Sequence, residues 1–411
     1  MMATPSTAGR FLAWTAGATA AGVIACMALV VVADPYRLYR LVERPGFNAV
    51  KIQPTRYQKQ IKLSAASAMQ ARFLIVGNSR AEIGLDPADP ALAGLGMPAY
   101  NLALAGTRIQ VANSALAELE RRGVQPRQLL VGAEFLDFPI DPTLPQAPVS
   151  DPIETLTARL AWRFDTLFSI DSLSEAVQTF SLQQAPYAKT MTAQGFNPLN
   201  EYKKLAQDEG YYALFQQRAN DYAKRFRSAP RSLMVGNSGT ARDFEQLDAT
   251  VAWGASHGER VDVVIYPYHA QLMALYEAAG MTALFDQWKT VLVQRMETVR
   301  TRYPQARITL WDFSGYGPYQ CEPVPAKGDR KSSTAWYWEA GHFKASLGHK
   351  MFARMLSGAL DPEDPGFGFE LTSATLGANR VRLQQERAAC LARQPGLFAA
   401  TAALYASQAP K

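Results

Sequence analysis

An uncharged apolar run near the N-terminus constrains this chain more than any other feature of its sequence. No charged residue occurs between Phe11 and Ala33. As an α-helix with a rise of about 1.5 Å per residue, the run is about 34 Å long, enough to cross a hydrocarbon core of about 30 Å. A cleaved signal peptide usually has a shorter apolar centre. We therefore predict a retained transmembrane anchor at residues 11–33, with cleavage near Ala33 as the alternative.

The charges that flank this run give a weak indication of its orientation. Only Arg10 precedes the run, whereas Arg37, Arg40 and Arg44 follow it closely. Read alone, the positive-inside rule would place the body of the protein in the cytoplasm, but large domains cross membranes largely regardless of charge. Because of the site chemistry described below, we expect residues 1–10 in the cytoplasm and the body on the opposite side.

The composition describes a folded body and excludes several classes of protein. Of the 411 residues, 48% are hydrophobic and 19% are charged, which excludes a disordered chain. The formal net charge of +6 is spread thinly, without the basic run of a nucleic-acid-binding tail. Three cysteines and four histidines exclude a disulfide scaffold and a Cys-based zinc finger, and we expect no metal or cofactor. The sequence leaves open whether Cys321 and Cys390 form a disulfide.

Beyond the run, short apolar segments alternate with helical patterns. We predict strands that run into turns at 71–80, 99–106, 128–135, 261–270 and 306–313, and helices at 109–122, 244–255, 283–303 and 342–360. Strands that are apolar throughout are typical of a parallel sheet covered on both faces. The sequence therefore predicts an α/β fold, a three-layer sandwich with a mainly parallel sheet.

The same pattern divides the chain into segments. A proline-containing juxtamembrane connector is expected at 34–68, and the main domain at 69–360. A helical insertion at about 140–235 interrupts the alternation, and 361–411 form a C-terminal extension. The insertion is rich in aromatic residues, which either form a wall that stacks on sugars or are simply extra helical packing.

Residues that could take part in catalysis or ligand binding follow several of these strands. Ligands of open parallel sheets bind beyond the carboxyl ends of the strands. Ser79 follows the first strand, and at the start of a helix its N–H would point at a developing oxyanion. The alternative interpretation is an ordinary serine at a helix cap. The other residues beyond the strands are Asn78, Arg80, Gly106, Glu134, Asp137, His269 and Asp312.

A late histidine supplies a candidate base. Glu339 lies three residues before His342, so its carboxylate can hold Nδ1–H and leave Nε2 to accept a proton from a serine. The alternative is a histidine that only caps or packs a helix start. His269 is either a substrate contact, an alternative base or a polar wall residue, and Asp312 is an alternative to Glu339.

The order of these segments resembles a known family. LIVGNSRAEIGLDP, then YNLALAG, then a late Glu-x-x-His are similar to the blocks of the SGNH (GDSL-like) hydrolase superfamily. More closely, they resemble its membrane-anchored branch, related to alginate O-acetyltransferases and to the protein of teichoic-acid D-alanylation. The resemblance implies that Ser79 is the nucleophile and His342 the base, with Glu339 in place of the usual aspartate. It also implies that the N–H groups of Ser79 and Gly106 bind the oxyanion.

The third block departs from the family. Glu134 stands where the superfamily has an asparagine that donates to the oxyanion, and an ionised glutamate cannot donate. Asn78 or Asn101 would then have to donate instead. We expect Arg80, Glu134 and His269 to contact substrate.

Together these features predict a membrane-anchored O-acyltransferase. An acyl group, acetyl in our expectation, would pass through an acyl-serine to an extracytoplasmic polysaccharide, with a multi-pass membrane acyltransferase as the donor partner. The expected location is a bacterial inner membrane crossed once, with the main domain in the periplasm. Two alternatives stay open: a membrane-tethered glycan esterase, and a non-catalytic scaffold of an exopolysaccharide assembly complex, which Glu134 favours. No dinucleotide-binding or P-loop glycine motif occurs.

Overall fold

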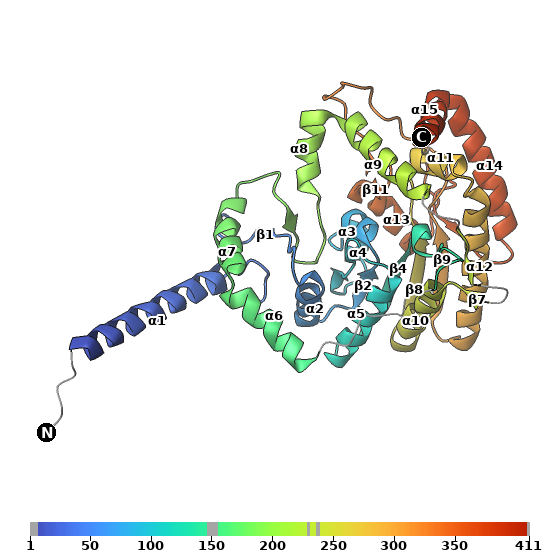
Figure 1. Cartoon of the computed structure of the whole chain (residues 1–411). Helices are drawn as coiled ribbons and strands as arrows, with labels where there is room; N and C mark the ends of the chain where they lie inside the picture. The colour runs from blue at the N-terminus through green and yellow to red at the C-terminus, as the bar shows by residue number, and fades with distance from the viewer. Residues whose placement is uncertain (1–6, 146–154, 228–230, 236–238, 409–411) are drawn as a thin grey trace.

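A six-stranded, mainly parallel sheet forms the centre of the body (Figure 1). The computed structural model describes residues 7–145, 155–227, 231–235 and 239–408. The strand order is β12-β9-β8-β4-β2-β3, and β12 alone of these six runs antiparallel to its neighbour. The strands are β2 (Phe73–Val76), β3 (Ala99–Asn101), β4 (Gln128–Ala133), β8 (Arg260–Ile265), β9 (Arg307–Asp312) and β12 (Phe369–Glu370). The predicted α/β class is confirmed.

Apolar side chains on both faces explain why the central strands are buried. All four residues of β2 are buried, and so are the last five of β4 and of β8. The edge strand β3 is shorter than the predicted segment 99–106, and its three residues pair with Phe73–Ile75 of β2. Backbone hydrogen bonds from Leu102 to Ile75 (2.8 Å) and from Leu104 to Gly77 (3.0 Å) still hold the chain beyond β3 beside the end of β2.

Helices cover both faces of the sheet. α5 (Ile109–Arg121), α10 (Arg242–His257) and α12 (Thr282–Arg302) pack side by side on one face. α13 (Ala345–Ser357) lies on the other with α3 (Ser79–Gly84) and α4 (Pro90–Ala93), where the ring of Phe352 packs 6.4 Å from that of Phe73. α2 (Gln58–Met69) packs against α5, and α11 (Ala270–Ala278) follows β8.

The insertion forms two helical pairs in different places. α6 (Leu156–Phe168) and α7 (Ile170–Leu182) lie beside the N-terminal helix, and β5 (Thr190–Met191) pairs with β1 (Lys51–Ile52) (Figure 1). α8 (Asn200–Glu209) packs against α9 (Tyr211–Phe226), which in turn packs against the C-terminal helix α15 (Pro395–Ser407). β6 (Met234–Val235) pairs antiparallel with β7 (Gly239–Thr240), which leads to α10. The chain between β4 and β8 therefore reaches both the N-terminal helix and the far side of the body.

The N-terminal helix α1 (Thr7–Ala33) projects away from the body (Figure 1). It is long and apolar enough to be a membrane span or a signal helix. Only its last turns are covered, where Val30 and Ala33 pack against Ala176 of α7. Two side chains of the connector cap its final carbonyls: Asn48 Nδ2 donates to Val32 O (2.8 Å), and Lys51 Nζ donates to Ala33 O (2.9 Å).

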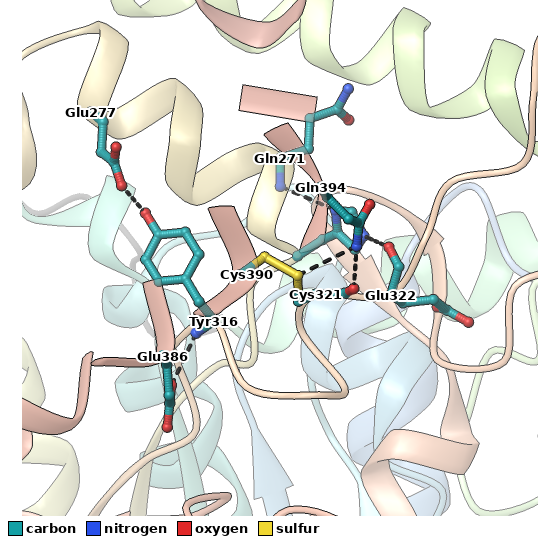
Figure 2. The surroundings of a disulfide bond; sticks show 9 residues. Gln271, Glu277, Tyr316, Cys321, Glu322, Glu386, Cys390 and Gln394 are labelled. Atoms are coloured by element: carbon teal, nitrogen blue, oxygen red, sulfur yellow. Dashed lines mark hydrogen bonds between the residues drawn. A yellow bond between two sulfur atoms is a disulfide. The ribbon is translucent and has the colours of Figure 1, made fainter. Parts of the chain in front are cut away.

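The C-terminal segment is joined to the body in three ways. β12 adds an edge strand to the sheet, and α15 (Pro395–Ser407) packs against α11 and α9. Cys390 of α14 (Leu376–Arg393) forms a disulfide with Cys321, with their Cα atoms 5.9 Å apart (Figure 2). The Gln394 amide donates to the carbonyl of Cys321 beside this bond. The disulfide fastens the loop that follows β9 to the C-terminal helices.

Candidate functional site

The candidate nucleophile lies where the strand order reverses. β2 has β3 on one side and β4 on the other, which is the kind of switch point where open α/β sheets bind ligands. Ser79 is the first residue of α3, just beyond β2. Asn78 is the N-cap, and its Oδ1 accepts a hydrogen bond from Arg80 N (3.0 Å). Because Asn78 caps the helix, Ser79 Oγ has no capping role.

The candidate base, His342, lies on a small β-hairpin rather than on a helix. The sequence predicted that His342 opens a helix over 342–360, and this is wrong. His342 lies in β11 (His342–Phe343), which pairs with β10 (Tyr337–Glu339), and α13 begins three residues later at Ala345. The hairpin pairs Glu339 directly with His342, so the two side chains are neighbours by strand register as well as by spacing.

Two glycines allow the base to reach the serine. A Cβ at Gly84 of α3 would lie 2.1 Å from the ring of Phe343, and a Cβ at Gly348 of α13 would lie 1.9 Å from Gly84 O. Any larger residue at these positions would push β11 and α13 away from α3. This close approach sets the position of His342 against the start of α3.

Ser79, His342 and Glu339 form a continuous hydrogen-bonded relay. Ser79 Oγ lies 2.8 Å from His342 Nε2. On the other side of the ring, His342 Nδ1 is hydrogen-bonded to Glu339 Oε1. A carboxylate only accepts, so the Nδ1 atom carries the proton and Nε2 is the acceptor for the serine hydroxyl. This arrangement activates a serine for attack on an acyl carbon.

The surroundings of Glu339 keep it ionised. The residue is 1% exposed, and burial alone would raise the pKa of its carboxyl. The charge and hydrogen bond of His342, the charge of Arg218 and the Gly341 N–H outweigh burial and lower that pKa to about 2. Arg218 Nε lies 3.2 Å from Oε1, and Gly341 N donates to Oε2 (2.7 Å). Glu339 is therefore a fixed negative charge behind the imidazole at all ordinary pH values.

Two backbone N–H groups are available for an oxyanion. The first N–H groups of a helix lack intrahelical acceptors, and Ser79 begins α3. Gly106 adopts a φ of 72° in a turn that lines the same cleft, and within the described part of the chain its N–H has no acceptor. The expectation that Asn101 donates is wrong. Asn101 is fully buried, and its amide already donates to Ala81 O and Leu85 O (2.8 Å each).

Glu134 does not stand in the site as an uncompensated charge. It follows β4, and its Oε2 is paired with the guanidinium of Arg80 while Oε1 accepts from Leu136 N (3.1 Å). Arg80 also donates to Tyr222 OH (2.8 Å). The pairing turns the carboxylate of Glu134 toward Arg80 and offsets its charge, which reduces the repulsion expected beside an oxyanion.

A cleft of about 500 Å³ opens over the relay. Ser79, His342, Gly106, Arg80 and Glu134 all line it. Asp137, the last residue of the short helix η1 (Phe135–Asp137), also lines the cleft. Burial together with the charge of Glu134 raises its pKa to about 8. Helix α9 supplies a further part of the polar wall, namely Arg218, Asp221, Tyr222 and Arg225.

The cleft residues of α9 were not predicted from the sequence. Arg218 contacts Glu339, and Tyr222 contacts Arg80, across more than a hundred residues of chain in each case. An alternation of polar and aromatic residues on α9 was the only available signal. Of the two roles considered for the aromatic residues, helical packing describes Tyr211, Phe215 and Phe226 of α9, which are buried in the core. Tyr222 of the same helix lines the cleft.

Two other candidate site residues, His269 and Asp312, have structural partners outside the relay. His269 is fully buried, caps α11 by accepting from Gln271 N (3.1 Å), and contacts Glu322 O through Nε2 (2.8 Å). Burial lowers the pKa of His269 to about 4, so it is neutral, and it does not line the cleft. Asp312 does not serve the relay either, since its carboxylate is paired with Lys289 Nζ (2.6 Å).

Comparison with known proteins assigns no family. No known protein family, curated protein or solved structure matches the chain. The chain is thus an α/β protein with a mainly parallel sheet and a long apolar N-terminal helix. A disulfide in the body is typical of proteins that fold outside the cytoplasm.

Proposed function

We propose that this protein is a membrane-anchored O-acyltransferase of the SGNH type that acylates an extracytoplasmic polysaccharide through an acyl-serine. The observation that carries the proposal is the relay of Ser79, His342 and Glu339, with 2.8 Å between the serine oxygen and the ring nitrogen. Its setting at the switch point of the sheet and beneath an open cleft supports the same conclusion.

The chemistry follows from the relay in two balanced steps. Ser79 Oγ attacks the donor's acyl carbon while its proton passes to His342 Nε2, and the leaving group departs with that proton. A sugar hydroxyl then attacks the acyl-serine and gives its proton to His342. Ser79 Oγ leaves the acyl carbon and recovers the proton. In both steps the Ser79 and Gly106 N–H groups face the developing oxyanion.

The way in which α1 joins the body supports a retained anchor. A cleaved signal peptide is absent from the mature protein. Here, by contrast, Lys51 and Asn48 cap the last carbonyls of α1, and α7 packs on its final turns. Loss of α1 would leave a buried lysine and an apolar face of α7 uncovered. An anchor holds the enzyme beside a membrane-bound acyl donor, for which we propose a multi-pass membrane acyltransferase.

Acceptor dependence tests transfer against hydrolysis. The full chain in detergent is incubated with p-nitrophenyl acetate, with or without soluble neutral and uronic-acid oligosaccharides. We expect acetylated sugar, and release of nitrophenol that rises when acceptor is added. Free acetate formed at the same rate in both cases, without acetylated sugar, would establish an esterase instead.

The Ser79→Ala variant tests whether the site is catalytic. Removing the nucleophile of such a relay is expected to lower the rate by roughly 10³-fold or more. Thermal unfolding serves as the control, since Ser79 Oγ has no capping role in α3. Unchanged polymer acylation in cells that carry this variant, with acylation lost when α1 is deleted, would favour the non-catalytic scaffold.

A further inference from the structure

The face of α6 and α7 next to the anchor is unusually apolar for an exposed surface. Its large exposed side chains include Leu160 (60% exposed), Phe164 (62%) and Ile170 (86%). The full set on these helices is Leu156, Leu160, Phe164, Phe168, Ile170 and Val177. A contiguous apolar patch on a surface marks an interaction site.

Helical spacing turns this patch toward the anchor. Leu160, Phe164 and Leu167 follow one another at intervals of four and three residues, so they share one face of α6. Leu167 packs against the cluster that contains Val30 and Ala33 of α1. The exposed residues of this face therefore lie on the side of α6 on which α1 joins the body, while Trp162 is buried.

The length of α1 places a bilayer surface at the same level. Arg10 is the only charged residue of α1, and a charge favours the headgroup region. A hydrocarbon core takes about 20 residues of helix, which ends near Val30 when counted from Arg10. Val30 is also where α7 begins to bury the helix. The outer edge of the hydrocarbon therefore meets α6 and α7.

We propose that α6 and α7 form an interfacial docking surface that rests on the bilayer crossed by α1. The connector extends this surface, since Leu41 and Phe47 are exposed and the Phe47 ring packs 4.9 Å from that of Phe180 in α7. Exposed arginines on the same segments, Arg40, Arg44 and Arg163, suit anionic headgroups. In Figure 1, α6 and α7 flank the point where α1 leaves the body.

The functional consequence is a fixed orientation of the domain. A single helix with a free connector would let the body rotate and tilt above the membrane. Apolar helices that lie in the interface add a second, independent attachment. The cleft over Ser79 is then held at a constant height, beside a donor in the same membrane.

The test measures the depth of labels in the full chain. Cys26, the free cysteine of the described residues, is replaced by serine, and single cysteines are introduced for an environment-sensitive fluorophore. The variants are Trp14→Cys in α1, Phe164→Cys in α6, Ile170→Cys in α7 and Lys204→Cys in α8. Each protein is reconstituted into phosphatidylcholine vesicles containing phosphatidylglycerol, with or without doxyl-labelled lipid.

We expect doxyl lipid to quench the labels at 14, 164 and 170 several-fold, and the label at 204 not at all. The inclusion of Ile170→Cys guards against a variant of Phe164 that fails to fold. The inference rests on the anchor of the proposed function, and the label at 14 separates the two. Quenching at 14 without quenching at 164 and 170 would overturn the docking surface and leave the anchor intact. No quenching at any site would overturn both.

Discussion

Between β4 and α10 the chain builds two helical pairs whose surfaces differ in chemistry. α9 turns Arg218, Asp221 and Tyr222 into the cleft, and two of these contact the relay or its neighbour Arg80. α6 and α7 instead expose leucine, phenylalanine and isoleucine beside the anchor. One insertion therefore contributes to two surfaces. The surface that faces the ionised relay is polar, and the surface beside the apolar helix α1 is apolar.

This comparison predicts that the same kind of substitution acts differently in the two pairs. Changes on the cleft side alter stability, rate and pH dependence in any medium. Changes on the α6–α7 side alter behaviour only when a bilayer is present.

The largest effect is expected from Arg80→Met on the cleft side. It leaves the buried carboxylate of Glu134 without its cation, which destabilises a fold by about 3–5 kcal/mol. Urea unfolding measures the loss. The double variant Arg80→Met/Glu134→Gln removes both charges and should recover much of it. A single variant as stable as the native protein would contradict a buried ion pair at this position.

Protonation of Glu339 at low pH should lower the free energy of unfolding by a comparable amount. Its pKa falls from an ordinary 4.5 to about 2 in the fold, so the folded state binds protons less readily than the unfolded state. The stabilisation is complete above about pH 4.5 and is lost as the pH falls toward 2. At about 1.4 kcal/mol per pKa unit it amounts to roughly 3 kcal/mol. Glu339→Gln should flatten urea-unfolding free energies between pH 6 and pH 3, whereas Phe164→Glu should leave their slope unchanged.

A smaller effect is expected from Arg218→Met. Arg218 is part-exposed and contacts the relay only through Glu339, so it is a positioning residue. Loss of about 1 kcal/mol of interaction corresponds to a rate lowered roughly fivefold, with a shifted pH–rate profile. Arg163→Met on α6 is the matched control and should leave the rate in detergent unchanged. A fivefold loss without any change in the pH profile would indicate a purely structural role.

The smallest effect on the isolated protein is expected from Leu160→Glu/Phe164→Glu. Both side chains are exposed, so the free energy of unfolding in detergent should change by no more than about 0.5 kcal/mol. In vesicles the same variant should lose the quenching by doxyl lipid of a label at position 170. A strongly destabilised variant in detergent would mean that these residues pack inside the protein.

The sequence predicted the strands well because their evidence is local. Uninterrupted apolar segments such as Phe73–Val76 indicate buried parallel strands wherever they occur. The spacing of Glu339 and His342 likewise indicated a pair. The secondary structure around this pair was predicted wrongly, because a helix was expected where the chain forms a hairpin. Strands as short as these carry little periodic signal.

The long-range partners of the polar residues near the site could not be predicted, for a physical reason. Arg80 contacts Glu134 and Tyr222 only after the sheet and α9 have packed. The amide of Asn101 likewise donates to two carbonyls of the α3 region only in the folded chain. No local pattern encodes these tertiary contacts. A polar residue at a strand end is a candidate donor in the sequence, but its hydrogen bonds decide whether it remains one.

The central claim is that His342 and Glu339 make Ser79 a nucleophile. Diisopropyl fluorophosphate tests it directly, because a reactive serine oxygen bonds to phosphorus and expels fluoride. Mass spectrometry of digested protein locates the adduct. We predict modification at Ser79 in the native chain, strong slowing in His342→Ala, and no adduct at this peptide in Ser79→Ala. Equal labelling of the native chain and His342→Ala, or an unmodified Ser79 in folded native protein, would contradict the account.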